Sequence, residues 1–156
     1  SCDPCDCGNR GCLQTFVGAS SLVKRARQLL PEYPTSVLHQ GALTIDAIEN
    51  AALADDPLAI HVISTAAEYL GIAVAGVLNL MNPGAVIIGG GIARLGERLL
   101  VPLRETVLRR TFVSSVAASE IMSSALGPRS IAIGAATIVL EAALGDPRLF
   151  PTIGAR

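Results

Sequence analysis

The stretch AVIIGGGIARLGERLLVPLRETVLRR (residues 85–110) changes from one secondary-structure pattern to another within a few residues. Its first four residues are apolar and mostly β-branched, which predicts a short buried strand. The three glycines Gly89 to Gly91 follow, and apolar residues then recur at helical spacing as far as Arg110. Pro102 lies inside the helical pattern and predicts a kink or two abutting helices. The segment therefore predicts a strand that turns sharply into a helix.

Upstream of this stretch, the sequence predicts three helices. Apolar residues recur at helical spacing from about residue 15 and stop before Pro31, which predicts the first helix. Thr44 is a suitable N-cap for a short second helix over residues 45–56. Pro57 suits the first turn of a third helix that ends at Met81, before Asn-Pro-Gly. The two aspartates before Pro57 are better explained as capping groups than as acid/base catalysts.

Downstream of the opening stretch, the sequence predicts a second strand and a final helix. The strand is expected within VAASEIMSSAL, residues 116–126. After Gly-Pro-Arg, Ser130 is expected to cap a helix over residues 131–144 that Gly-Asp-Pro ends. The last residues show no periodicity and predict a tail without regular structure. The predicted order is a loop, three helices, and then strand, helix, strand and helix.

The composition describes a compact globular protein. Of 156 residues, 51% are hydrophobic, 3% aromatic and 16% charged, which excludes a disordered or fibrous chain and suits one domain with a sizeable core. The formal net charge is −1, and no block of Lys or Arg would attract a nucleic-acid backbone or an anionic membrane. The longest apolar stretch, residues 70–81, is shorter than the roughly 20 residues of a membrane-spanning helix and predicts a buried core helix.

All cysteines of the chain lie in one short segment, CDPCDCGNRGC (residues 2–12). Cys5, Cys7 and Cys12 form the pattern C-x-C-G-x-x-G-C, in which the glycines allow the positive φ angles needed to bring three sulfurs together. Tetrahedral coordination of Zn²⁺ by thiolates is the predicted use of these sulfurs. A disulfide-closed loop is the alternative, but Cys5 and Cys7 are too close to pair comfortably, and nothing else indicates a secreted protein. We therefore expect a cytoplasmic protein.

A structural zinc site usually has four ligands, so these three cysteines need a fourth partner. The candidates are Cys2, His39, His61 and residues before Ser1. Each isolated histidine is better explained as an ordinary loop or helix residue. A chain that starts with Ser1 inside a cysteine-rich loop, with no signal-peptide pattern, indicates a fragment of a longer protein.

The segment CDCGNRGCLQ (residues 5–14) closely resembles the cysteine signature of the ROK family, a group of repressors, open reading frames and sugar kinases. The resemblance implies that Cys5, Cys7 and Cys12 bind zinc together with a histidine that would fall before Ser1. It also implies a sugar-binding role for Gln14, which stands where the family has a glutamate that contacts sugar hydroxyls. An amide can hydrogen-bond a hydroxyl but is not a charged acceptor.

Two further segments resemble the family in the same order. Residues 79–107 are similar to its strand, glycine turn and helix, and in the family's kinases Gly89, Gly90 and Gly91 would let the backbone approach the adenosine of ATP. Close packing of strand and helix, with no ligand, is the alternative. The segment SALGPRSIAIGAATIVLEAAL is similar to the last strand-to-helix junction, but Ser130 and Ile131 replace the small Ala-Gly pair common in the kinases. A bulky side chain there would crowd a nucleotide and favours the family's transcriptional regulators.

The resemblance implies an α/β fold, the C-terminal lobe of an actin-like ATPase (ribonuclease-H-like) fold with a zinc-binding loop. The loop would comprise residues 1–14, the lobe residues 15–144 and the tail residues 145–156. The N-terminal part of the parent protein would be absent. In the family that part carries the aspartate base and the phosphate loop of the kinases, so this chain would not be a complete kinase.

We expect the effector-binding and oligomerisation part of a ROK transcriptional regulator, not catalytic by itself. The expected partners are a sugar or sugar-phosphate effector and further copies in a homodimer or tetramer; DNA would be reached only through an absent N-terminal domain, and no membrane is involved. The alternative is the C-terminal half of a glucokinase-like enzyme that phosphorylates a hexose or amino sugar with ATP. A zinc-stabilised dimerisation module that binds no ligand is the third possibility. Zinc is expected in all three, and ATP only in the kinase.

Overall fold

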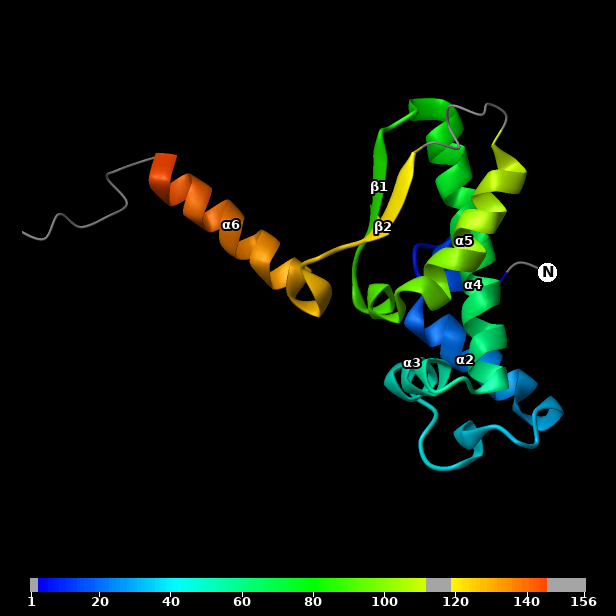
Figure 1. Ribbon diagram of the computed structural model, residues 1–156. Coiled ribbons are helices and arrows are strands. Elements are labelled where there is room, and N and C mark those ends of the chain that lie inside the picture. The colour runs from blue at the N-terminus through cyan, green and yellow to red at the C-terminus, as the bar shows by residue number, and fades with distance from the viewer. Residues whose placement is uncertain (1–2, 112–118, 146–156) are drawn as a thin grey trace, which may run out of the picture.

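The computed structural model describes residues 3–111 and 119–145. A body of helices stands beside a two-stranded sheet, and the last helix extends away from both (Figure 1). The α-helices are α1 (Gln14–Val17), α2 (Ala19–Leu29), α3 (Ile45–Leu53), α4 (Pro57–Met81), α5 (Glu97–Arg110) and α6 (Ser130–Gly145). The strands are β1 (Ala85–Ile88) and β2 (Glu120–Ser123). The 3-10 helices are η1 (Leu30–Glu32), η2 (Val37–His39), η3 (Gly91–Leu95) and η5 (Gly127–Arg129).

The core lies where α4 packs against α5 and where α2 and α3 pack against α4. Its largest fully buried side chains are Leu22, Ile48, Leu58, Val62, Ile63, Leu78, Leu99 and Leu103. At Gly71 the two long helices approach closely, because a Cβ there would lie 2.8 Å from Cβ of Thr106 and 2.9 Å from the backbone oxygen of Leu103. Burial of these apolar side chains holds the helices together and so positions the loops and turns between them.

Helix α4 confirms the predicted third helix, with the apolar stretch of residues 70–81 in its C-terminal half. The helix has 25 residues and is long and apolar enough to cross a membrane by length and composition, but half of its most apolar window is buried in the fold. Within residues 70–81, Val74 and Leu78 are buried, whereas Leu80 and Met81 at the C-terminal end are exposed. A polar cap starts the helix and Asn82, in the left-handed region, ends it.

Asp56 is the N-cap of α4, as the sequence predicts. Its carboxylate accepts hydrogen bonds from Ala59 N–H (3.0 Å), Val37 N–H (2.8 Å) and the Ser36 hydroxyl (3.0 Å). Burial raises the pKa of the Asp56 carboxyl, but these hydrogen bonds outweigh burial and hold the pKa below its ordinary value. The cap therefore ties the loop before α3 to the start of α4. Thr44 likewise caps α3, with its hydroxyl oxygen accepting from Ala47 N–H.

Two predicted helices are divided by glycines. The first one breaks at Gly18, which is extended between α1 and α2. A Cβ at Gly18 would lie 2.6 Å from the backbone oxygen of Gln14, so only glycine fits this break. The helix after the glycine turn starts at Glu97 rather than at residue 92, because Gly96 has a φ of 53°. Helix α5 continues through Pro102, so the break predicted at that proline lies at Gly96 instead.

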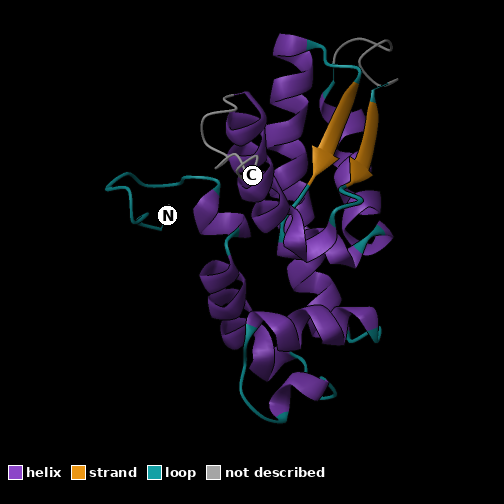
Figure 2. Cartoon of the chain, turned by 90° about the vertical axis from the view of Figure 1, so that its left-hand side faces the viewer, coloured by secondary structure: helices purple, strands orange, loops and turns teal. Residues whose placement is uncertain are grey.

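The strands β1 and β2 are parallel, with Ala85 opposite Glu120 and Ile88 opposite Ser123 (Figure 2). Residues 85–88 form the predicted strand, but the expectation that the strand is buried is wrong: Ile88 is buried, whereas Ile87 is 64% exposed. Side chains of a strand alternate between two faces, and in the described part of the chain only one face of this pair is covered by helices. Part of the predicted second strand, residues 112–118, lies outside the described residues.

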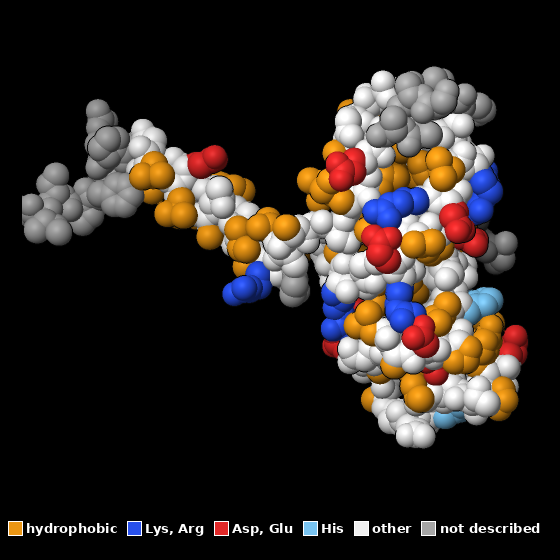
Figure 3. Space-filling view, viewed as in Figure 1, with side chains coloured by type: hydrophobic (Ala, Val, Ile, Leu, Met, Phe, Trp, Pro, Cys, Tyr) orange, Lys and Arg blue, Asp and Glu red, His pale blue; other side chains and the backbone are white. Residues whose placement is uncertain are grey.

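Helix α6 begins at Ser130 itself, which has helical φ and ψ, so Ser130 is not the N-cap that the sequence predicts. The 3-10 turn η5 leads directly into it. No side chain of α6 is buried against the described residues. Its hydrophobic side chains are visible along the surface in Figure 3, and Ile131 and Leu144 are 79% and 76% exposed. The predicted tail beyond Gly145 lies outside the described residues.

Candidate functional site

The cysteine segment folds into a tight loop before α1. Cys5 N–H donates to the backbone oxygen of Asn9 (2.8 Å), and Gly8 N–H donates back to the backbone oxygen of Cys5 (2.9 Å). Gly8 and Gly11 have φ angles of 88° and 68°, so the positive φ angles predicted for both glycines are confirmed. The loop is held to α2 by an ion pair of 2.7 Å between Lys24 Nζ and Asp3 Oδ2.

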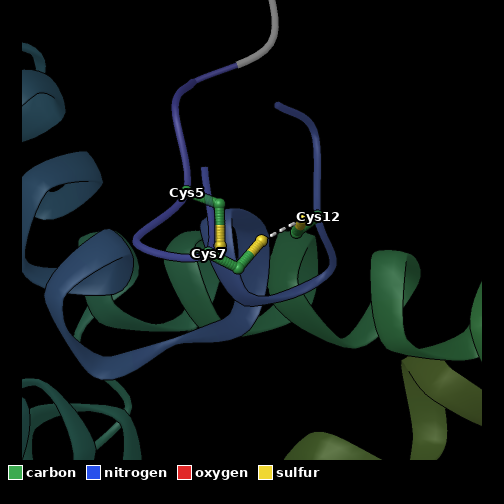
Figure 4. A group of neighbouring side chains, drawn as sticks. All are labelled: Cys5, Cys7 and Cys12. Carbon is green, nitrogen blue, oxygen red and sulfur yellow. Dashed lines mark hydrogen bonds between the residues drawn. The ribbon is translucent and has the colours of Figure 1, made fainter. Parts of the chain in front are cut away.

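This loop brings three thiols to one point. The sulfurs of Cys5, Cys7 and Cys12 all lie within 4.8 Å of one another (Figure 4). The sulfurs of Cys7 and Cys12 are 3.6 Å apart, and all three cysteines are free rather than disulfide-bonded. Two thiolates on one tetrahedral zinc ion, with Zn–S bonds of about 2.3 Å, stand about 3.8 Å apart. The three sulfurs could therefore hold a metal ion with little rearrangement.

The three thiols do not titrate alike. A hydrogen bond from the backbone N–H of Asn9, together with hydrogen bonds from Cys12 and Cys5, lowers the pKa of Cys7 below its ordinary value. The hydrogen bonds that Cys12 shares with Cys7 and Cys5 raise the pKa of Cys12 to about 11. The Cys7 thiol therefore loses its proton more readily than the Cys12 thiol does. A bound cation would favour the thiolate form of each.

The histidines proposed as a fourth ligand lie elsewhere. His61 Nδ1 is 3.0 Å from the hydroxyl of Tyr33, and His39 Nε2 is 3.1 Å from the backbone oxygen of the same tyrosine. Neither joins the group of sulfurs among the described residues, so both drop out as candidates. Each is engaged by Tyr33, which sequence spacing does not reveal. Cys2 lies outside the described residues.

Gln14 is the first residue of α1 and is exposed. Its position two residues after Cys12 places it beside the cysteine loop, where it lines a small cavity of about 60 Å³ together with Cys5 and Asp6. Gln14 also lines a much larger cavity. The residue predicted to contact a sugar therefore lies next to the cysteine loop and lines a space large enough for a ligand.

The larger cavity has a volume of about 630 Å³. It lies between the start of α2, one face of α3 and the glycine turn after β1. Its lining residues include Gln14, Glu49, Gly89, Gly90, Gly91 and Ile131. The fold thus brings the predicted sugar-binding and nucleotide-binding residues, which are 75 or more positions apart in the sequence, to one cavity.

The glycine turn leaves this cavity open. A Cβ at Gly89 would be 4.0 Å from the nearest side chain and one at Gly91 would be 3.9 Å from Glu49 Oε1, both ordinary van der Waals distances. A Cβ at Gly90 would meet no atom of residues 3–111 and 119–145 within 4 Å, and its φ of 84° is the reason that favours glycine there. Close packing of strand and helix does not require three glycines here. Their effect is to leave backbone exposed to the cavity.

Sequence reasoning missed the polar residues of this cavity. Glu49 on α3 is only 4% exposed and pairs with Arg94, which lies just after the glycine turn. Arg94 Nη2 also donates to Asn50 Oδ1 (3.2 Å) and to the backbone oxygen of Asp46 (3.4 Å). The available signal was Asp46, Glu49 and Asn50 at spacings of three and four, which puts three polar groups on one face of a helix. The sequence does not identify Arg94 as their partner, because Arg94 lies more than 40 residues further along the chain.

The family model described as "ROK family" matches residues 1–142 of the chain. The chain belongs to the ROK family. Both kinds of ROK protein are similar to it. The glucokinase of Thermotoga maritima is 34% identical over 142 residues, which cover 88% of this chain and 45% of that protein. The xylose repressor of Caldicellulosiruptor bescii is 32% identical over 149 residues, covering 93% of this chain and 37% of that protein.

The fold agrees with this membership. A ROK family glucokinase from Streptomyces griseus, solved in complex with glucose and AMPPNP, superposes with a TM-score of 0.75 at 28% identity. The match covers 86% of this chain and 46% of that one. The chain therefore has an α/β fold that matches part of a ROK sugar kinase, and it spans less than half the length of these relatives.

Proposed function

We propose that this chain is the effector-binding and oligomerisation part of a ROK transcriptional regulator and is not catalytic by itself. One observation carries the proposal. Ile131 lines the cavity at the glycine turn, at the position where the ROK kinases commonly have a small residue. A β-branched side chain there narrows the space beside Gly89, Gly90 and Gly91, which disfavours an adenine nucleotide. Gln14, at the rim of the same cavity, is proposed to accept a hydrogen bond from an effector sugar.

A ROK sugar kinase is the second candidate. The open backbone at the glycine turn supports it, because three glycines that no packing contact requires suit the close approach of a nucleotide. Similarity to a glucokinase that was solved with glucose and AMPPNP supports it as well. In this alternative, ATP binds at Gly89, Gly90 and Gly91, and the whole protein phosphorylates a hexose or amino sugar.

The decisive experiment uses the full-length protein. We expect no ATP-dependent phosphorylation across a panel of hexoses and amino sugars, measured by ADP release, and sugar-dependent release from operator DNA. Sugar phosphorylation at enzymatic rates would overturn the regulator assignment in favour of the kinase. Absence of both sugar binding and phosphorylation would leave a dimerisation module without a ligand.

A matched pair of variants tests the role of Ile131. Ile131→Ala in the full-length protein should strengthen binding of AMPPNP, measured by calorimetry, because it removes the side chain that narrows the cavity. Ile138→Ala is the control: it lies on the same helix, is 69% exposed and does not line the cavity. If the two substitutions change AMPPNP affinity equally, Ile131 does not hinder nucleotide binding and no longer supports the regulator assignment.

We also propose that Cys5, Cys7 and Cys12 bind one structural Zn²⁺, which would hold the loop and Gln14 in place. The sulfur geometry supports this, and the fourth ligand is proposed to lie outside residues 3–111 and 119–145. Metal analysis of the purified protein should give about one zinc per chain. Cys7→Ser should abolish zinc binding, whereas Cys2→Ser should abolish zinc binding only if Cys2 is the fourth ligand. Metal-free protein with its thiols in disulfides would contradict the proposal.

Homo-oligomerisation is proposed from the exposed apolar side chains at the ends of the long helices. Leu80 and Met81 at the end of α4 are 86% and 71% exposed, and Leu108 near the end of α5 is 60% exposed. A dimer or tetramer would cover them. We propose that the protein works in the cytoplasm, where thiols stay reduced, and contacts DNA only through a domain upstream of this chain.

A further inference from the structure

Glu49 is the most deeply buried charged residue that lines the cavity. Only 4% of its surface is exposed, and it lies in the middle of α3, on the side that faces the glycine turn. A buried carboxylate is costly unless it is paired and hydrogen-bonded. Arg94 supplies that partner, with its Nε donating to Glu49 Oε2. The pair links α3 to the turn that follows β1.

The second oxygen of Glu49 is left for another partner. Oε2 is taken by Arg94, whereas no residue in the described part of the chain donates a hydrogen bond to Oε1. Oε1 faces the glycine turn, because a Cβ built on Gly91 would lie 3.9 Å from it. Gly91 has no Cβ between its backbone and this oxygen, and both Gly91 and Glu49 line the cavity. Buried polar atoms normally have a hydrogen-bond partner, so a buried carboxylate that lines a cavity with one oxygen unpartnered by the described residues is unusual.

Arg94 holds the carboxylate in this orientation. Its guanidinium also donates to Asn50 Oδ1 and to the backbone oxygen of Asp46, so three points on α3 hold the arginine in place. A guanidinium fork fixed in this way orients its carboxylate partner more firmly than a lysine could. The arrangement pre-orders Oε1 before any ligand arrives, which reduces the entropy lost on binding.

We infer that Glu49 is the charged hydrogen-bond acceptor of this cavity and that its Oε1 binds a hydroxyl of a sugar ring. The ring is either a free hexose or the ribose of a nucleoside, and both present the same donor. Arg94 is a positioning residue that acts through Glu49. The inference rests on the proposed function, because it names a contact for the ligand of the same cavity.

The test compares each ligand with its deoxy analogue. Calorimetry on the full-length protein would use hexoses against their monodeoxy analogues in one arm, and ATP against 2′,3′-dideoxy-ATP in the other. Glu49→Gln should weaken binding of the hydroxyl-bearing ligand about tenfold, because it removes a charge-assisted hydrogen bond. Its affinity for the matching deoxy analogue should stay within about twofold of wild type, since that contact is already missing. The arm in which Glu49→Gln weakens only the hydroxyl-bearing ligand shows whether the bound ring is a hexose or the ribose of a nucleoside.

Two further variants test whether Glu49 contacts the ligand directly or only supports the structure of the cavity. Glu68→Gln makes the same change at an exposed carboxylate on α4, outside the cavity, and should leave all affinities unchanged. The double variant Glu49→Gln/Arg94→Gln removes both charges, so it keeps the test valid if Glu49→Gln alone unfolds. It should show the same selective loss for the hydroxyl-bearing ligand.

The outcomes are distinct. If Glu49→Gln weakens ligand and deoxy analogue equally in both arms, Glu49 only supports the architecture and the inference is wrong. If it weakens neither, the inference is wrong and the proposed function stands. If the wild-type protein binds no sugar and no nucleotide, the proposed function fails, and this inference fails with it.

Discussion

Glycine serves opposite purposes in two regions of this molecule. At Gly71, in the contact between α4 and α5, a Cβ would fall 2.8 Å from Thr106, so the residue is glycine because the space is full. At Gly89 and Gly91 a Cβ would meet nothing closer than 3.9 Å, and the residues border a cavity. The difference teaches that a glycine-rich turn beside a strand marks a ligand site only when the structure shows the space around it.

The same contrast extends to the polar groups of the two regions. Around α4, the polar groups of the cap are satisfied within the chain: Asp56 accepts three hydrogen bonds and is fully engaged. At the cavity, Glu49 is equally buried, yet only one of its oxygens is engaged by the described residues. A closed hydrogen-bond set stabilises a fold, whereas an incomplete one offers a contact to a ligand.

The largest effect on stability is expected at Gly71, where α4 and α5 pack most closely. Gly71→Ala should lower the free energy of unfolding by about 1–3 kcal/mol, because the new methyl group must displace the backbone of α5 or Thr106. Gly76→Ala is the control on the same helix: apart from its chain neighbours and the helix backbone, no atom of the described residues lies within 4 Å of its Cβ position, and Ala should raise the free energy of unfolding by about 0.5–1 kcal/mol. Urea denaturation measures both. Effects of the same sign would break the distinction between filled and open glycine sites.

A smaller effect is expected at the cap of α4. Asp56→Ala should lower the free energy of unfolding by about 1–2 kcal/mol at neutral pH. The folded-state pKa of Asp56 lies below its unfolded value, so the carboxylate stabilises the fold fully above a pH of about 4. This contribution is lost as the pH falls through the folded-state pKa.

The pH dependence identifies the charge as the cause. The difference between wild type and Asp56→Ala in denaturant titrations should therefore narrow below a pH of about 4. Thr44→Ala, which removes the uncharged cap of α3, should cost about 1 kcal/mol at every pH. A gap for Asp56→Ala that does not change with pH would show that its hydrogen bonds contribute without the charge.

The smallest effect on stability is expected at Gly89, the first residue of the glycine turn. Gly89→Ala should change the free energy of unfolding by less than about 0.5 kcal/mol, since its Cβ would contact nothing closer than Ser124 at 4.0 Å. Because Gly89 lines the cavity, the methyl group should nevertheless weaken binding of whichever hexose or nucleotide the wild type binds. Gly90→Ala, at a φ of 84°, should cost about 1–2 kcal/mol because of backbone strain. Strong destabilisation by Gly89→Ala would instead indicate a packing role.

Features set by neighbours in sequence were predictable. The C-x-C-G-x-x-G-C spacing predicted the grouped sulfurs, and the positive φ angles of Gly8 and Gly11 follow from the same short segment. The caps at Thr44 and Asp56 were predictable for the same reason, since a cap bonds a backbone N–H three residues away. Errors arose where a glycine interrupts a helical pattern, as at Gly18, because apolar spacing does not report backbone dihedrals.

The sequence by itself determined the order of strands and helices, the group of thiols and the family, because each depends on residues close together in the chain. Only the tertiary structure decided that Gln14 and the glycine turn share one cavity, that Arg94 pairs with Glu49, and that Gly71 lies in a filled space while Gly89 borders an open one. These facts depend on how helices pack across long separations. Local propensity and periodicity carry no information about such contacts.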